Sequence, residues 1–155
     1  MKHSVVAICA TSAFVLTALS GCRSDGTRTQ SFTRQVPAST AAIVESAVKT
    51  FSDYGISVTV ADEPGGKVQT APADLKGRLA SGSPDDRVTC EPGPAASDAT
   101  SSPLMISFQV TVRPVSGGSV VLLEARRESG GNGCIVKSTF VAQLLDGVVQ
   151  GARRP

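Results

Sequence analysis

The stretch Leu104-Met105-Ile106-Ser107-Phe108-Gln109-Val110-Thr111-Val112-Arg113 decides the fold of this chain. Its period of two predicts a β-strand with one apolar face, made of Leu104, Ile106, Phe108, Val110 and Val112. Residues 114–118 carry the proline and glycines of a turn, and residues 119–126 are again rich in aliphatic side chains. The sequence therefore predicts a long hairpin with one buried face.

A shorter hairpin and a further strand precede this region. Residues 56–61 alternate with period two, residues 62–66 read Asp-Glu-Pro-Gly-Gly as in a turn, and residues 67–70 begin a returning strand. Residues 32–36 form another candidate strand, which Pro37 ends.

Two segments have the apolar spacing of amphipathic helices. The first begins at a cap formed by Ser39 or Thr40 and ends near Tyr54, where Gly55 suits a left-handed C-terminal position. The second begins at a cap formed by Ser138 or Thr139. Its apolar residues recur as adjacent pairs four residues apart, namely Phe140 and Val141, Leu144 and Leu145, and Val148 and Val149.

These elements predict an α+β fold with a mostly antiparallel sheet and the two amphipathic helices packed on one face, in a two-layer sandwich. Residues 32–155 are expected to form this single domain. Residues 76–103 are dominated by Ser, Pro, Gly, Asp and Ala, which predicts a long flexible loop with one short strand over 87–90. The segment 90–103 is either a plain connection or a partner-binding segment.

The N-terminal region has the organisation of a secretory signal. Lys2 is followed by an uncharged apolar run over 5–19, which is too short for a membrane-spanning helix. Leu19-Ser20-Gly21-Cys22 resembles the lipobox of bacterial lipoproteins, which implies a signal peptide over 1–21 and a diacylglycerol on Cys22. An ordinary cleaved signal peptide or an uncleaved anchor are the alternatives. Residues 22–31 are expected to form a flexible tether.

Two of the four cysteines, Cys90 and Cys134, remain after the signal peptide and the lipid site are assigned. An even pair in an exported protein favours a structural disulfide between them, which would stabilise the fold by about 4 kcal/mol in the chain-entropy model. Two buried free thiols or a redox pair are the alternatives, although no C-x-x-C motif supports the latter.

A second resemblance involves the first helix and the hairpin that follows it. The pattern is Ala42-x-x-Glu45-x-Ala47-Val48-x-x-Phe51-x-x-Tyr54-Gly55-Ile56-x-Val58-x-x-Ala61-Asp62-x-x-x-Gly66-x-Val68-x-Thr70. It is similar to the opening of helix-grip-type domains in envelope lipoproteins, of which BamC-type accessory lipoproteins of the outer-membrane β-barrel assembly machine are the best known. The resemblance implies a helix-grip-like fold and an envelope location, and no catalytic residue.

Several kinds of chemistry have little support in the sequence. The only histidine, His3, lies in the signal segment, so the mature chain lacks a His-based nucleophile system and the usual zinc ligands. The carboxylate pairs Asp62-Glu63 and Asp85-Asp86 are expected in solvated turns. A net charge of +2 gives no electrostatic case for nucleic acid. No catalytic residue, cofactor or metal is therefore predicted.

The functional expectation is a non-enzymatic envelope protein, anchored to the membrane through the lipid on Cys22, that binds an envelope protein as an accessory or scaffold subunit. Arg23 rather than Asp follows the cysteine, which favours the outer membrane with the domain facing the periplasm. The alternative is a carrier or sensor of an apolar ligand between helix and sheet. A hydrolase is the least favoured third reading.

Overall fold

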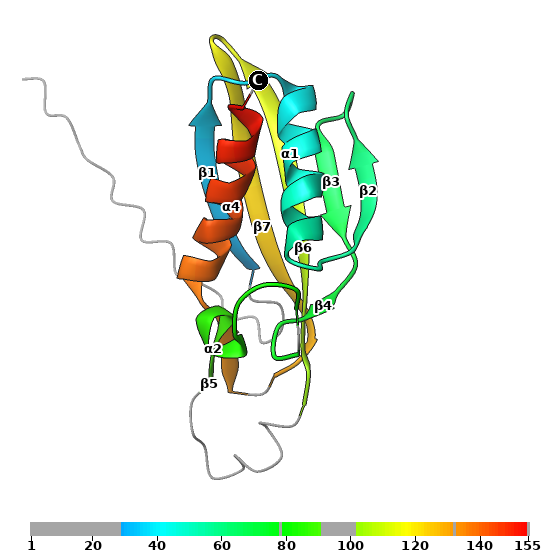
Figure 1. Ribbon diagram of the computed structural model, residues 1–155, viewed down its shortest axis with the longest axis vertical. Helices are drawn as coiled ribbons and strands as arrows, with labels where there is room; N and C mark the ends of the chain where they lie inside the picture. The colour runs from blue at the N-terminus through cyan, green and yellow to red at the C-terminus, as the bar shows by residue number, and fades with distance from the viewer. Residues whose placement is uncertain (1–28, 78, 91–101, 132, 155) are drawn as a thin grey trace, which may run out of the picture.

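The computed structural model describes residues 29–77, 79–90, 102–131 and 133–154. They form a six-stranded antiparallel sheet in the order β1-β7-β6-β3-β2, with β4 pairing to β6. The strands are β1 (Thr29–Val36), β2 (Val58–Asp62), β3 (Lys67–Thr70), β4 (Ala73–Asp74), β6 (Leu104–Val115) and β7 (Gly118–Gly130). The predicted α+β class with a mostly antiparallel sheet is thus confirmed (Figure 1).

The hairpin of β6 and β7 forms the centre of the sheet. Its register runs from Leu104 opposite Gly130 to Val115 opposite Gly118, with one irregularity between Met105 and Ile106. The side chains on one face of β6 are buried from Leu104 to Val112, as the period of two predicts. Those on the other face are only partly buried, so the hairpin has one core face and one open face.

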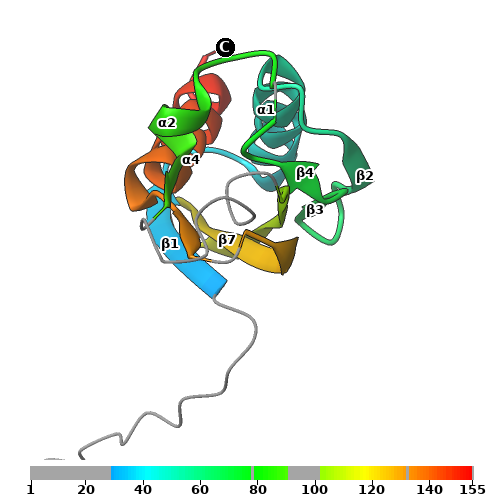
Figure 2. The same cartoon turned by 90° about the horizontal axis from the view of Figure 1, so that it is seen from below.

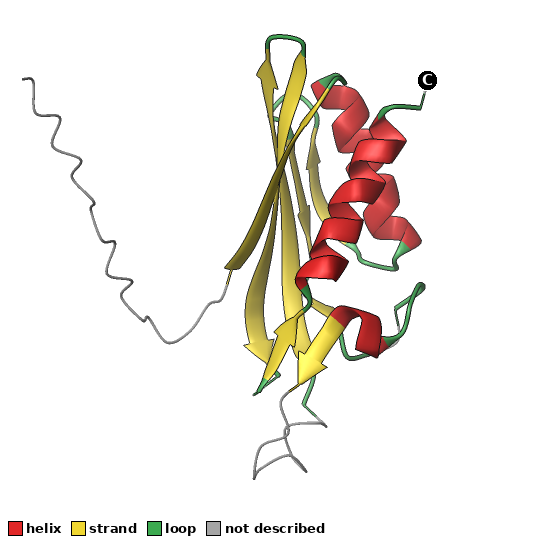
Figure 3. Ribbon diagram, turned by 90° about the vertical axis from the view of Figure 1, so that its left-hand side faces the viewer, coloured by secondary structure: helices red, strands yellow, loops and turns green. Residues whose placement is uncertain are grey.

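Two long helices, α1 (Thr40–Asp53) and α4 (Ser138–Ala152), lie on the core side of the sheet (Figure 3). Ser39 caps α1 by accepting a hydrogen bond from the Ala42 N–H, and Gly55 follows the helix with a φ of 75°. The two helices contact each other along their length, where the buried Ser46 Oγ donates to the Val148 carbonyl at 2.8 Å. Viewed end-on, the sheet curves around them from β1 to β2 (Figure 2).

Aromatic side chains fill the space between the helices and the sheet. The ring centroids of Phe51 on α1 and Phe108 on β6 are 5.8 Å apart, and those of Phe108 and Phe140 on α4 are 6.4 Å apart. Tyr54 packs edge-on against Phe140 at 5.7 Å. All three phenylalanines are buried, which joins both helices and the central strand in one core.

A small second sheet lies at the end of the molecule that is at the bottom of Figure 1. It pairs β5 (Val88–Cys90) with β8 (Cys134–Val136), and the short helix α2 (Pro84–Arg87) leads directly into β5. Cys90 and Cys134 are partners in this pairing and form the predicted disulfide, with 3.9 Å between their Cα atoms.

The structure corrects two boundaries predicted from the sequence and adds a helix. The first strand begins at Thr29, within the predicted tether of 22–31, because Thr29, Gln30 and Ser31 pair with Arg126, Ala125 and Glu124 of β7. Inside the predicted loop of 76–103, the short strand expected over 87–90 is confirmed as β5, whereas the preceding residues 84–87 form the helix α2; the disulfide and the pairing with β8 fix β5. Among the described residues, α2 is thus a third helix where two were expected. Residues 91–101 of that loop lie outside the described residues.

Candidate functional site: a groove between α1 and β2

The strand β2 forms one edge of the main sheet. It pairs with β3 on one side, and the part of the chain that the structure describes provides no strand on its other side. Its residues are unusually exposed, and Val60 is 39% exposed in a strand next to the core. An edge of this kind presents backbone N–H and C=O groups to which a further extended segment can pair.

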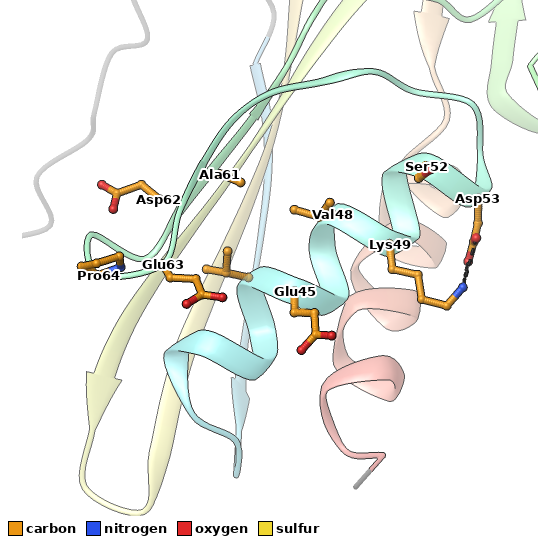
Figure 4. A pocket seen from close by; sticks show the side chains of 10 residues that line it. Glu45, Val48, Lys49, Ser52, Asp53, Ala61, Asp62, Glu63 and Pro64 are labelled. Carbon is orange, nitrogen blue, oxygen red and sulfur yellow. Dashed lines mark hydrogen bonds and ion pairs between the residues drawn. The ribbon is translucent and has the colours of Figure 1, made fainter.

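A groove of about 790 Å³ lies beside this edge, between α1 and the turn that joins β2 to β3. Its apolar part comes from Val44 of α1 and from three residues labelled in Figure 4, namely Val48 of α1, Ala61 of β2 and Pro64 of the turn. Val44 is buried in the core, whereas Ala61 and Pro64 are exposed. The groove is therefore a shallow apolar floor between a helix and an open sheet edge.

Four acidic residues line the groove, and of these Asp62 points away from α1 (Figure 4). Glu45 and Asp53 lie on α1, and Asp62 and Glu63 lie at the end of β2 and in the turn. Figure 4 shows Glu45 and Lys49 projecting from α1 and Glu63 extending from the turn. Lys49 pairs with Asp53 at 3.0 Å, and among the described residues no ion pair involves the other three carboxylates. The groove thus carries an excess of negative charge.

The turn that carries Glu63 is fastened to the neighbouring sheet. The Gly66 carbonyl accepts a hydrogen bond from the Val112 N–H of β6 at 2.7 Å, and the Gly66 N–H donates to the Glu63 carbonyl at 3.1 Å. Asp62 Oδ1 accepts from the Gly65 N–H at 3.0 Å. These bonds fix the turn to β6, so the side of the groove that carries Glu63 is held in place by the sheet.

The residues singled out from the sequence lie in different places. Cys22, the predicted lipid site, lies outside the described residues. Asp62 and Glu63 both line the groove. Asp62 accepts a hydrogen bond from the Gly65 N–H, and the Glu63 side chain is exposed. Asp85 and Asp86 lie on the exposed α2 at the other end, where hydrogen bonds from the Ser83 backbone N–H and hydroxyl lower the pKa of Asp86. The two carboxylate pairs therefore do not converge on one site.

A second cavity, of about 390 Å³, lies where the main sheet meets the small one. Leu104, Ile106, Ala125 and Val136 line its apolar part. Gln30 lies at this cavity as well and donates from Nε2 to the Val136 carbonyl at 2.8 Å. This is an apolar recess at the end of the core rather than a space between helix and sheet, which the aromatic side chains occupy.

The acidic groove was not predicted from the sequence, although the sequence shows some of the acidic residues that form it. Glu45 occupies an exposed position of an amphipathic helix, and the acidic turn follows in the next hairpin. The sequence did not show that β2 is an edge strand, because strand order depends on long-range pairing.

The described residues hold no group of three potential metal ligands and no helix long and apolar enough to span a membrane. No protein-family model and no curated protein matches the sequence.

Solved structures of similar outline share little sequence with this chain. Ara h 8.0201 matches with a TM-score of 0.44 at 12% identity, over 82% of this chain and 95% of that one. An uncharacterised protein from Rhizobium leguminosarum matches at 0.40 and 12% identity, over 84% and 97%. The Zhui aromatase/cyclase from Streptomyces sp. R1128 matches at 0.32 and 12% identity, over 81% and 86%. No function follows from similarities at this level.

Proposed function

We propose that this protein is a lipid-anchored, non-enzymatic subunit of the bacterial cell envelope that binds an extended, basic segment of another envelope protein. The observation that carries the proposal is the open edge of β2 beside an acidic groove. The segment adds to the sheet as a strand next to β2, and its side chains on the helix side enter the groove.

The geometry of a strand explains why the two features act together. Side chains of an added strand alternate between the two faces of the sheet, so every second one points toward α1. Apolar residues at these positions contact Val48 and Ala61, and Lys or Arg residues reach Glu45 and Glu63. Exposed ion pairs contribute only about 0–1 kcal/mol each, so the backbone pairing supplies affinity and the charges favour basic partners.

The proposed compartment follows from the lipobox and is supported by the disulfide. A disulfide between Cys90 and Cys134 persists in an oxidising compartment such as the bacterial envelope. The lipid on Cys22 keeps the domain at the membrane, and two acyl chains hold more durably than one. The outer membrane, with the domain facing the periplasm, remains our proposal because Arg23 follows the cysteine.

Site-specific photo-crosslinking in cells tests the binding edge. A photoreactive amino acid at Val60 is expected to trap a discrete protein partner, and the same group at the exposed Gln150 of α4 is not. The variant Glu45→Lys with Glu63→Lys is expected to reduce the Val60 crosslink at least severalfold. Glu128→Lys, an exposed change at the far end of β7, is the matched control and leaves it intact. Equal crosslinking from both positions, or no effect of the charge reversals, would contradict the proposal.

A second candidate function is the transport or sensing of a small apolar ligand. The cavity of about 390 Å³ lined by Leu104, Ile106, Ala125 and Val136 favours it. Native mass spectrometry of the full chain purified from its own cells tests this reading. A bound molecule that is lost on Ala125→Phe, which fills the cavity, would support it, and a ligand-free spectrum would exclude it.

A further inference from the structure

A separate pocket of about 320 Å³ lies at the lower end of the molecule, away from the groove at β2. It is formed by the end of α1, the segment that carries α2, and the first turn of α4. Its lining is mostly polar and consists of Tyr54, Ser81, Gly82, Asp86, Arg87, Lys137, Thr139, Phe140 and Gln143. The proposed function does not use this pocket.

The unusual member of this lining is Arg87. Its side chain is buried, with a residue exposure of 1%. Nη2 donates to the Gly77 carbonyl at 3.0 Å, while Nε and Nη1 have no hydrogen-bond partner in the described part of the chain. No ion pair to Arg87 exists among those residues either. A buried guanidinium with unpaired donors destabilises the folded state, so a bound partner that accepts from these donors would be favourable.

Neutralisation does not remove this cost. Burial lowers the pKa of Arg87, and the Asp86 and Asp74 carboxylates oppose that shift. An arginine side chain nevertheless stays protonated in proteins, since its ordinary pKa lies far above neutral pH. A buried positive charge therefore remains, and an anion is the group that satisfies it.

A second cation and a helix end face the same space. Lys137 lines the pocket and donates from Nζ to the Asp85 carbonyl. It is also the N-terminal cap of the 15-residue helix α4, and its side chain does not cap the helix. The N-terminus of a helix carries partial positive charge. Asp86 is the only carboxylate of the lining, and its Oδ2 is held by the Ser83 N–H and hydroxyl.

We propose that this pocket binds the oxyanion group of a small ligand, a phosphate or carboxylate, between Arg87 and Lys137. Guanidinium and ammonium groups are the usual donors to such anions, and their hydrogen bonds to a charged acceptor are about twice as strong as neutral ones. The neighbouring Ser81, Thr139 and Gln143 provide further polar groups for the rest of the ligand.

The small sheet holds the two cations at a fixed separation. The Lys137 N–H donates to the Arg87 carbonyl at 2.8 Å, which continues the pairing of β5 with β8. The Cys90–Cys134 disulfide closes the same pair of strands three residues from each cation. The site is therefore preorganised by the covalent link rather than assembled by the ligand.

Titration of the full chain in detergent micelles with inorganic phosphate, at constant ionic strength, tests the proposal. Saturable changes in the 15N NMR signal of Arg87 Nε and a rise in the thermal midpoint are expected. Lys137→Gln, a change at a half-buried position, is expected to weaken binding at least fivefold without unfolding the protein. Lys49→Gln, an exposed lysine at the other groove, is the matched control and leaves phosphate binding unchanged.

The source of the anion is distinguished by a second probe. A short-chain phosphatidylglycerol that binds more tightly than inorganic phosphate, with the same sensitivity to Lys137→Gln, indicates a lipid headgroup. Tighter binding of inorganic phosphate or acetate indicates a soluble anion. Absence of saturable binding by all three probes, or equal binding by wild type and Lys137→Gln, overturns the site. Neither result bears on crosslinking at β2, which tests the proposed function.

Discussion

Gly66 shows how one residue shapes the proposed binding groove. Its φ is 61°, and a Cβ atom built on it would lie 2.6 Å from the Val112 carbonyl oxygen. We expect Gly66→Ala to destabilise the fold by about 1–3 kcal/mol, because both the backbone conformation and the contact with β6 become strained. Urea unfolding of the two proteins measures this difference.

The adjacent Gly65 provides the control. A Cβ there would meet the exposed side chain of Asp62 rather than backbone, and that side chain can move away at the cost of one solvent-exposed hydrogen bond to the Gly65 N–H. Gly65→Ala is therefore expected to change the free energy of unfolding far less. If both variants lose equal stability, the strain attributed to Gly66 is not the cause.

Asp86 predicts a dependence of stability on pH. Hydrogen bonds from the Ser83 backbone N–H and hydroxyl lower its pKa from 3.8, so the folded state favours the ionised form. A group with a lowered folded pKa stabilises the protein above its unfolded pKa and loses this effect as pH falls through the folded value. We expect Asp86→Asn to be less stable than wild type at pH 7, with the difference shrinking below pH 3.8.

Urea unfolding at pH 7 and at acid pH measures this effect, with the exposed Asp85→Asn as the comparison variant. A stability difference between Asp86→Asn and wild type that is the same at every pH would contradict the assignment. The residue is fully exposed, so the effect is expected to be small and to weaken with added salt.

At the scale of elements, the disulfide holds the small sheet and the two segments that it joins. Cys90 is exposed and Cys134 is buried, and the two are 44 residues apart in sequence. The variant Cys90→Ser with Cys134→Ala is expected to lose about 2–4 kcal/mol of unfolding free energy, because the unfolded chain regains its loop entropy. Unfolding of wild type with and without reductant gives the same comparison without mutation. Equal midpoints in both conditions would show that the bond does not stabilise the fold.

Local sequence patterns predicted the helices and strands whose apolar periodicity and end signals match their packing in the fold. The long β6–β7 hairpin follows from its period of two, and α1 follows from the Ser39 cap, its apolar face and Gly55. The strand β4, of two residues, and the helix α2, of four, were not predicted, because such short elements show no recognisable apolar periodicity. Thr29 and Gln30 gain their strand conformation from pairing with Arg126 and Ala125, which are far away in the sequence.

Both candidate sites depend on how the whole molecule is assembled. The groove forms only because β2 is an edge strand and α1 lies beside it. Neither arrangement can be predicted from local sequence patterns. The Arg87 pocket joins residues from three separate segments, and Arg87 itself was expected in a short strand. Its burial with no ion pair among the described residues is a tertiary property, so only the folded structure marks it as a site.

The location of the whole molecule is predicted to depend on one atom, the sulfur of Cys22. We expect Cys22→Ser to move the protein from the membrane fraction to the soluble fraction, because each lost acyl methylene removes about 0.8 kcal/mol of membrane affinity. The described domain begins at Thr29, so its circular dichroism spectrum should stay unchanged.

Cell fractionation with intact-mass measurement checks this prediction, and Cys9→Ser, within the apolar run, is the matched control. The wild-type mass should match a chain that begins at Cys22 and carries a diacylglycerol, whereas an unlipidated chain beginning elsewhere would refute the anchor. In that case the groove at β2 would still be tested by crosslinking, because the proposed partner surface lies on the described domain. Loss of the Val60 crosslink in Cys22→Ser, with the domain still folded, would show that membrane attachment brings the protein to its partner.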